Sequence, residues 1–174
     1  DKNGADGAEV MTSLTATYDT PIALTANAYT NMGYTYTGWN TEADGTGTAF
    51  TNGQTVSNLA TSGHFTLYAQ WVANNYTIVY DKNATDATGS TISTSATYDV
   101  DVEIATNGYT REGYDFTGWN TQAGGTGVAY TEGQTVKNLT ATDGGTYTLY
   151  AHLPRLEHAS HSYGSRQRPR HNER

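Results

Sequence analysis

The most constraining feature of the sequence is a block of residues that occurs twice. Residues 33–60 and residues 113–140 are identical at 19 of 28 aligned positions, with a constant offset of 80. Glycines and aromatic residues are prominent among the identical positions, as in the triplets 38–40 and 118–120, both Gly-Trp-Asn. A long repeat period of this kind indicates a tandem array of small domains. Such arrays commonly present extended surfaces or act as spacers, so we expect a structural or binding protein rather than an enzyme.

The repeat register divides the chain into four parts. We predict a first repeat at residues 1–71, a short linker at 72–75, a second repeat at 76–152 and a tail at 153–174. Because the linker has only four residues, it cannot act as a long flexible tether. We therefore expect the two domains to lie end to end with limited freedom.

The two copies differ near their ends. Beyond Leu139 the second copy gains two residues, and an insertion of this kind indicates a surface turn before the last strand. The second copy opens with Tyr76–Tyr80, and the first copy has no counterpart ahead of Asp1. We expect the chain to begin inside a repeat and to be part of a longer array. Its first repeat is either left incomplete or completed by self-association with a second copy through an exposed strand edge.

Alternating aromatic and β-branched residues predict strands in both copies. The predicted strands are residues 13–18, 34–39 and 65–71 in the first copy, and residues 76–80, 91–98, 114–119 and 147–151 in the second. Helical periodicity is scarce, with room for a helical turn at residues 21–27, 101–107, 56–59 and 136–139. The pattern predicts a mostly β chain of the α+β class with little helix.

Charge and composition narrow the possible functions. Residues 1–152 carry 15 acidic and 4 basic side chains, a net charge of −11. Such an acidic body lacks the basic patch that nucleic-acid binding needs. The chain has no cysteine, which excludes disulfides and thiolate ligands, and it has no apolar run long enough to insert into a membrane. No cofactor or metal is expected.

The last 22 residues differ from the rest of the chain. They hold five of the nine Lys and Arg residues and three of the five histidines, without apolar periodicity. We interpret residues 153–174 as non-native sequence and exclude them from fold reasoning. The alternative is a basic tail that binds nucleic acid or cell wall.

Several motifs resemble the Listeria–Bacteroides repeat, or internalin-type B repeat. The resemblance rests on residues 76–83 (Tyr-Thr-Ile-Val-Tyr-Asp-Lys-Asn), 107–119 and 66–71 (Thr-Leu-Tyr-Ala-Gln-Trp). It implies tandem β-grasp-like (ubiquitin- or SUMO-like) domains on secreted or wall-attached bacterial surface proteins, with no shared catalytic residues. Its structural signature positions in this chain are Gly38, Gly118, Leu67, Tyr68, Trp71, Leu149 and Tyr150. The second copy departs from it at Leu153, where the closing tryptophan is missing.

Four aromatic residues are the candidate ligand-binding positions: Trp39, Trp119, Tyr34 and Tyr114. Exposed aromatic rings stack on sugars, whereas a buried tryptophan anchors a small core by removing about 150–250 Å² from water. Packing is the favoured interpretation for the two tryptophans, because they recur in so small a domain. Rows of exposed tyrosine and threonine remain a possible surface for host or cell-wall glycan or protein.

Other chemistry has weaker support in the sequence. Residues 1–7 and 81–86 faintly resemble a calcium loop, but the ligand spacing fails and Lys2 and Lys82 intrude. An isopeptide bond between such a lysine and Asn40 or Asn120 is an open alternative. No catalytic motif is present. We expect a semi-rigid stalk of an extracellular bacterial surface protein, the alternative being an adhesion module.

Overall fold

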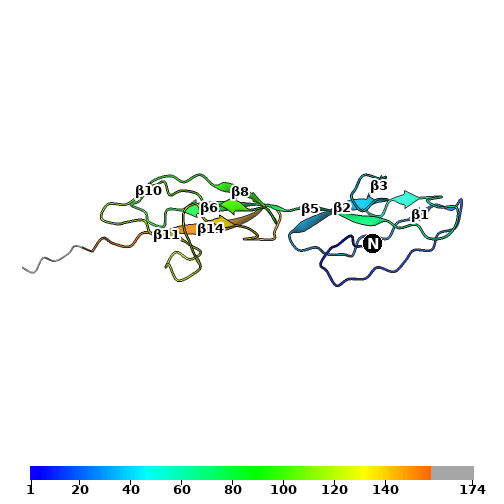
Figure 1. The fold of residues 1–174 in the computed structure, drawn as a ribbon, viewed down its shortest axis with the longest axis horizontal. Coiled ribbons are helices and arrows are strands. Elements are labelled where there is room, and N and C mark those ends of the chain that lie inside the picture. Colours follow the sequence, from blue (N-terminus) through cyan, green and yellow to red (C-terminus); the bar gives the residue numbers. More distant parts are fainter. Residues whose placement is uncertain (158–174) are drawn as a thin grey trace, which may run out of the picture.

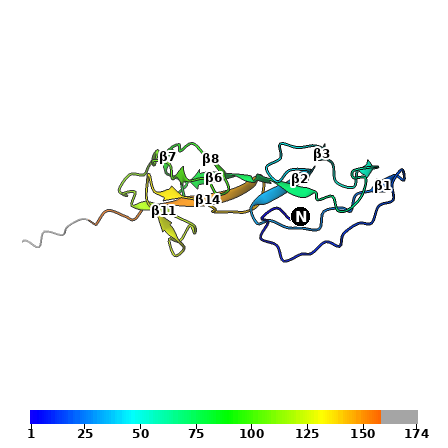
Figure 2. The same cartoon turned by 45° about the vertical axis from the view of Figure 1, so that its right-hand side comes forward.

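The computed structural model describes residues 1–157, which form two lobes placed end to end along one long axis (Figure 1). The same arrangement is seen after rotation by 45° (Figure 2). The lobe that contains the N-terminus is called repeat 1 (residues 1–73), and the other is repeat 2 (residues 75–152). Strands of one lobe are followed directly by strands of the other, so the long axis is built from extended chain.

Repeat 2 is organised around a five-stranded sheet. Its strands are β6 (Asn75–Asp81), β8 (Thr94–Thr97), β11 (Gly118–Asn120), β12 (Ala129–Tyr130) and β14 (Gly145–His152). The sheet order is β12-β11-β14-β6-β8. The first and last strands, β6 and β14, run parallel at its centre, and the other pairings are antiparallel. This arrangement joins the two ends of the repeat in one sheet.

The core of repeat 2 depends on β6. Its alternate residues Tyr76, Ile78 and Tyr80 are buried, as expected for a strand with one face toward the interior. They form one cluster with Ala96, Ile104, Trp119, Leu149 and Ala151. A fully buried aliphatic side chain contributes about 1.5–3 kcal/mol, so this cluster is the main source of stability in repeat 2.

Repeat 1 has a smaller sheet of β3 (Ala49–Phe50), β2 (Tyr34–Asn40) and β5 (Tyr68–Ala73), in the order β3-β2-β5. No described strand takes the place of β6 or β8. The strand predicted at residues 13–18 is therefore wrong, and the strand predicted at 65–71 begins only at Tyr68. Both errors have one cause, because the backbone groups of these segments have no neighbouring strand with which to pair.

Short strand pairs replace the predicted helical turns. In repeat 1, β1 (Ile22–Ala23) pairs with β4 (Thr55–Val56). In repeat 2, β9 (Val102–Glu103) pairs with β13 (Thr135–Val136). A further short pair, β7 (Thr88–Gly89) with β10 (Tyr109–Thr110), lies outside the predicted helical turns. Residues 1–157 contain no helix. The prediction of a mostly β chain is confirmed, and its helical component is corrected, because β-branched residues at these positions pair across the fold.

Apart from β6 and β8, the two repeats share their unusual backbone conformations. Three pairs of equivalent residues have positive φ: Asn3 and Asn83, Asp19 and Asp99, Asn58 and Asn138. Asn and Asp tolerate this region better than other side chains. Gly38 and Gly118 have φ of 152° and 143°, and an added Cβ would lie 2.8 and 2.9 Å from the carbonyl oxygens of Phe50 and Tyr130. These twin positions therefore have the same local backbone.

Candidate functional site at the repeat junction

One buried asparagine connects the two repeats. Asn74 is the only residue between β5 and β6, and it is 7% exposed. Its backbone N–H donates to the Gly33 carbonyl of repeat 1 at 2.8 Å, and its carbonyl accepts from the Tyr98 N–H of repeat 2 at 2.8 Å. Its side chain accepts from the Thr35 hydroxyl at 2.6 Å and donates to the Ala141 carbonyl at 2.8 Å. Asn74 is thus bonded to both lobes through both its backbone and its side chain.

A loop of repeat 2 reinforces this connection. The loop at residues 141–145 is the one that carries the two-residue insertion of the second copy. The Asn75 N–H donates to the Asp143 carboxylate at 3.1 Å, and the Asn75 carbonyl accepts from the Gly144 N–H at 2.8 Å. The Asn75 side chain also accepts from the Thr97 hydroxyl at 2.8 Å. The inserted loop therefore binds Asn75, at the point where the chain enters repeat 2.

Aromatic residues pack across the junction beside Asn74. The Tyr34 ring of repeat 1 meets the Tyr98 ring of repeat 2 edge to face, with centroids 5.9 Å apart. Gly33 is buried beneath the same ring, and a Cβ there would lie 2.3 Å from Tyr98. The equivalent Gly113 has the same φ of 77° but nothing within 4 Å of a Cβ. Glycine is thus needed at position 33 for close approach as well as for backbone conformation.

A hydrogen bond between side chains also crosses the junction. The Tyr34 hydroxyl donates to the Asp99 carboxylate at 2.8 Å. Asp99 is held in place by Asn138, whose side-chain amide donates to it at 2.7 Å. The hydrogen bonds from Asn138 and then Tyr34 hold the pKa of Asp99 below its usual value, whereas the carboxylate raises the pKa of Tyr34. The charged form of Asp99 is therefore the form that binds Tyr34.

Together these contacts restrict rotation between the lobes. A hinge requires residues whose φ and ψ angles can change. Here the backbone N–H and carbonyl groups of both Asn74 and Asn75 are hydrogen-bonded, and these bonds oppose such changes. Sequence reasoning placed Asn74 in a simple linker and the loop at 141–145 in a surface turn. Two features of the sequence could have indicated a rigid junction: the insertion in the second copy, and the lack of glycine in the segment that connects the two repeats.

The four predicted ligand-binding residues do not come together. Trp39 and Trp119 are 5% and 1% exposed, so neither indole presents a face on which a sugar could stack. Trp119 packs against Phe116 and Tyr80, and its indole N–H donates to the Ala105 carbonyl at 3.1 Å. Tyr34 belongs to the junction. Tyr114, in the other repeat, lies beneath the Arg111 guanidinium, which is 3.7 Å from its ring centroid.

The signature residues serve packing and pairing. Leu149 is fully buried, and Leu67, Tyr68 and Tyr150 are partly buried on the matching closing segments. Trp71 packs edge to face against Tyr36, and its indole N–H donates to the Lys2 carbonyl at 3.1 Å. None of these side chains lies at the repeat junction.

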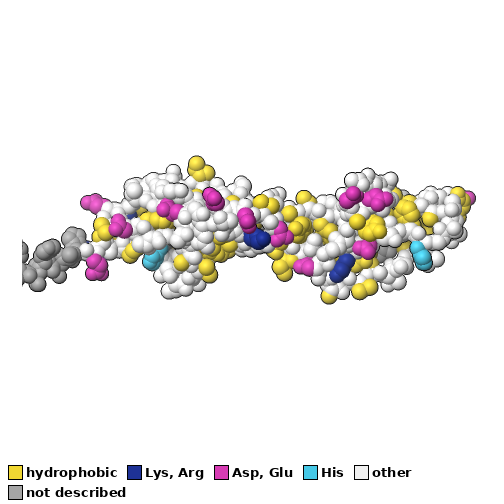
Figure 3. All heavy atoms as spheres, viewed as in Figure 1, with side chains coloured by type: hydrophobic (Ala, Val, Ile, Leu, Met, Phe, Trp, Pro, Cys, Tyr) yellow, Lys and Arg dark blue, Asp and Glu magenta, His cyan; other side chains and the backbone are white. Residues whose placement is uncertain are grey.

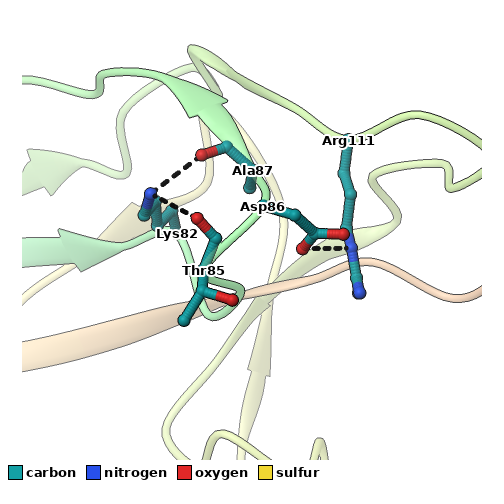
Figure 4. A network of polar contacts seen from close by, with 5 residues as sticks. All are labelled: Lys82, Thr85, Asp86, Ala87 and Arg111. Carbon is teal, nitrogen blue, oxygen red and sulfur yellow. Dashed lines mark hydrogen bonds and ion pairs between the residues drawn. The ribbon is translucent and has the colours of Figure 1, made fainter.

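The loop that resembles a calcium site is filled by a lysine (Figure 4). The Lys82 ammonium donates to the carbonyls of Ala87 at 2.8 Å and Thr85 at 3.3 Å, where a cation would take such oxygens. Asp86 instead forms an ion pair of 2.8 Å with Arg111, and this bond lowers the pKa of Asp86. Within residues 1–157 no group of three acidic or histidine side chains is placed to hold a metal.

The lysines and asparagines of the isopeptide alternative are engaged separately. The Asn120 amide donates to the carbonyls of Gly125 and Gly127 and accepts from backbone N–H groups of its own turn. The Asn40 amide makes the corresponding donations to Gly45 and Gly47. Each amide thus stabilises the turn that follows its Gly-Trp-Asn triplet.

The surface is sparsely charged. Acidic side chains are scattered over the visible face of both lobes, with few basic ones among them (Figure 3). Within the described part of the chain, no helix is long and apolar enough to span a bilayer. The tail interpretation concerns residues 153–174, of which 158–174 lie outside the described residues.

Comparison with known proteins gives a family match that covers most of the chain. The family model of the Listeria-Bacteroides repeat domain matches residues 1–70 and again residues 76–152. Two similar proteins come from Evansella cellulosilytica. A provisionally named Gly-rich membrane protein is 35% identical over 122 residues, and a provisionally named membrane protein is 39% identical over 77 residues.

These relatives are much longer than this chain. The first match covers 68% of this chain and 14% of the relative, and the second covers 44% of this chain and 12% of the relative. The chain thus spans about one seventh of the length of the first relative. No solved structure gives a significant match.

Proposed function

The chain belongs to the Listeria-Bacteroides repeat domain family, and on that premise we propose that it is a semi-rigid spacer of a bacterial cell-surface protein. Its two repeats hold whatever follows them at a fixed distance and direction. The proposal assigns the chain no catalysis and no cofactor.

The observation that carries this proposal is the bonding of Asn74. A flexible connection would leave its polar groups to water, whereas Asn74 is 7% exposed and bonded to both repeats. A buried polar group that loses its partner costs about 1–3 kcal/mol. Bending the junction would break several such bonds together, so the straight arrangement is the favoured one.

The sheet of repeat 2 supports a β-grasp-like assignment for each repeat. Its first and last strands, β6 and β14, are parallel neighbours at the centre, and each has an antiparallel partner outside, β8 and β11. Ubiquitin-like β-grasp domains share this strand order. The helix of those domains has no counterpart here, and the segment around Ile104 covers the core in its place.

The relatives support a place in the cell envelope. Both are provisionally named membrane proteins, and each is far longer than this chain. Tandem repeats within such a protein are suited to span the distance between an anchor and a distal domain. We place the repeats on the extracellular side.

An adhesive module is the alternative, with host or cell-wall glycan or protein as its ligand. It has less support, because Trp39 and Trp119 are buried and Tyr34 is engaged at the junction.

The decisive experiment measures the distance between the two repeats. Because the chain contains no cysteine, Thr55→Cys and Thr135→Cys together introduce one spin label on β4 and one on β13, at equivalent exposed positions. Pulsed electron resonance should give one narrow distance distribution. Asn74→Ala should broaden it, because both side-chain bonds across the junction are lost.

Asn52→Ala is the matched control. Asn52 is exposed and accepts a bond only from the Asn27 N–H within repeat 1, so its loss should leave the distribution unchanged. A broad distribution in the parent chain, with both repeats protected from hydrogen exchange, would contradict the spacer. Glycan binding by such a hinged chain would favour the adhesive alternative.

A further inference from the structure

We propose that Asn52 is a site of spontaneous modification, at which repeat 1 loses ammonia and gains a carboxylate. The chain has three Asn-Gly pairs, at residues 3–4, 52–53 and 107–108. An asparagine side chain is open to attack by the next backbone nitrogen when that residue is glycine, because glycine has no Cβ to hinder the approach. The structure separates the three pairs by the hydrogen bonds of their reacting groups.

The reaction takes only water as a second reactant. The backbone nitrogen of Gly53 bonds to the side-chain carbonyl carbon of Asn52, and its proton passes to the amide nitrogen, which leaves as ammonia. Both reacting groups belong to neighbouring residues, so the step is intramolecular. Water then opens the cyclic imide at one of its two carbonyl carbons. One opening gives aspartate, and the other gives isoaspartate, in which the main chain runs through the former side-chain carbon.

The turn at residues 51–54 exposes the nucleophile and the leaving group. It is closed by the Gln54 N–H, which donates to the Thr51 carbonyl at 3.2 Å. Asn52 and Gly53 are both exposed. Within residues 1–157, neither the Gly53 N–H nor the Asn52 amide nitrogen donates to a protein atom. The fold therefore places no hydrogen bond in the way of the attack or of the departure of ammonia.

The hydrogen bond that the Asn52 side chain does make favours the reaction. Its carbonyl oxygen accepts from the Asn27 N–H at 2.8 Å. Negative charge develops on this oxygen when the Gly53 nitrogen attacks the adjoining carbon. A backbone N–H that is already directed at the oxygen stabilises this charge.

The other two Asn-Gly pairs are held by hydrogen bonds. The side chain of Asn107 accepts from the Tyr109 N–H and donates to the Tyr109 carbonyl, both at 2.9 Å. The Gly108 N–H donates to the Thr91 hydroxyl at 2.9 Å. The amide nitrogen of Asn3 donates to two backbone carbonyls, at 2.7 and 2.9 Å. These bonds must break before either asparagine reacts, so both should react slowly.

The equivalent turn of repeat 2 indicates that the fold accepts the aspartate product. The short pairs β1-β4 and β9-β13 frame the two turns in the same register. Repeat 2 has Glu132 in place of Asn52, and its carboxylate accepts from the Asn107 N–H, the counterpart of the Asn27 N–H. Aspartate at position 52 would therefore keep a donor that a carboxylate already uses in the other repeat. Isoaspartate lengthens the main chain of the turn and should weaken the pairing of β1 with β4.

The test follows the full chain during incubation at mildly alkaline pH, with digestion and mass spectrometry at intervals. Asn52 and Asn107 form a matched pair, because both lie in the tripeptide Thr-Asn-Gly. In the folded chain Asn52 should react at least about tenfold faster, because only the groups of Asn107 must first be released from hydrogen bonds. In concentrated urea the two rates should be alike.

Two variants separate the contributions. Asn52→Gln has a longer side chain that disfavours ring closure, so it should abolish the acidic product seen by isoelectric focusing. Glu132→Asn places an Asn-Gly pair in the turn of repeat 2, where the Gly133 N–H donates to the Ile104 carbonyl at 2.9 Å. It should react about threefold or more slowly than Asn52, since its nucleophile is bound. Hydrogen exchange checks that both variants are folded.

Either of two results would overturn the proposal. One is an Asn52 that stays intact in the folded chain while it reacts in urea. The other is a folded chain in which Asn107, or the asparagine of folded Glu132→Asn, reacts as fast as Asn52. Neither result bears on the spacer, because β1, beside which the turn lies, is at the end of repeat 1 away from the junction (Figure 1).

Discussion

In repeat 2, β6 lies between β14 and β8 and buries three of its side chains, whereas in repeat 1 no described strand takes that place. The consequences extend over the whole lobe. Residues 63–67 and 14–17 do not form strands, although their counterparts in repeat 2 do. One central strand thus determines whether its two neighbours become strands, because each needs hydrogen-bond partners on that side.

The opposite end of the repeats shows the reverse difference. In repeat 1, β5 continues to Ala73 and pairs with β2 as far as Tyr34. In repeat 2, β14 ends at His152, and beyond it only a single bridge joins Tyr114 to Arg155. Pro154 occupies the position of Val72 and has no N–H to donate to a ladder. The antiparallel pairing of β14 with β11 is therefore shorter than that of β5 with β2.

The largest expected contrast is between the two tryptophans. Trp119→Ala should destabilise repeat 2 by about 3–5 kcal/mol, because its indole fills a closed core. Trp39→Ala should cost about 2 kcal/mol or less, since Trp39 lines a cavity of about 590 Å³ in repeat 1 and its indole N–H has no bond partner within the described chain. Hydrogen exchange of β11 and β2 in the full chain measures both. Equal losses would show that this cavity does not weaken the core of repeat 1.

The twin glycines should behave alike. Gly38→Ala and Gly118→Ala should each destabilise the altered repeat by about 2 kcal/mol, because both have positive φ and both place a Cβ against a carbonyl oxygen. The same exchange measurement applies. Gly124→Ala, where a Cβ has open space, is the control and should have little effect. A much larger loss in one repeat would mean that their local backbones differ.

Tyr36→Phe should stabilise repeat 1 by about 1 kcal/mol. The Tyr36 hydroxyl is buried without a partner within the described chain, and repeat 2 has Phe116 at the same position. The matched change in repeat 2, Tyr147→Phe, should have the opposite sign, because the Tyr147 hydroxyl shares a hydrogen bond of 3.1 Å with Tyr130. Urea denaturation of the two variants compares them, and destabilisation by both would indicate a hidden partner of Tyr36.

The smallest expected effect is a loss of folding stability at alkaline pH. Burial raises the pKa of Tyr36 to about 12, and burial with the Tyr130 hydrogen bond raises that of Tyr147 to about 12. An unfolded tyrosine loses its proton near pH 10, so the stabilisation is fully present below about pH 10 and is lost toward pH 12. Both rings are partly exposed, so solvent reduces the effect.

Phenolate absorbance during an alkaline titration tests this expectation. In Tyr36→Phe the alkaline loss of stability should become smaller in repeat 1 and remain unchanged in repeat 2. Titration of every tyrosine near pH 10 in the folded chain would contradict it.

Much of the fold could be predicted from the repeated residues, and the junction could not. Where both neighbouring strands are present, as for Tyr76–Tyr80, the alternation of aromatic and β-branched residues predicts the strand correctly. Residues 13–18 show a similar pattern and fail, because alternation reports a preference and not a partner. The short pairs β1-β4 and β9-β13 were missed, because two-residue strands carry no periodicity.

The sequence by itself determined that the chain is two copies of one small β repeat, with a short connection and twin glycine and asparagine positions. These are local or pairwise properties, readable from spacing and side-chain type. The tertiary structure alone decided that Asn74 bonds both lobes, that the inserted loop at 141–145 supports it, and that residues 14–17 and 63–67 are not strands. Each of these depends on hydrogen bonds between residues far apart in the chain, and such contacts exist only once the strands have found their neighbours.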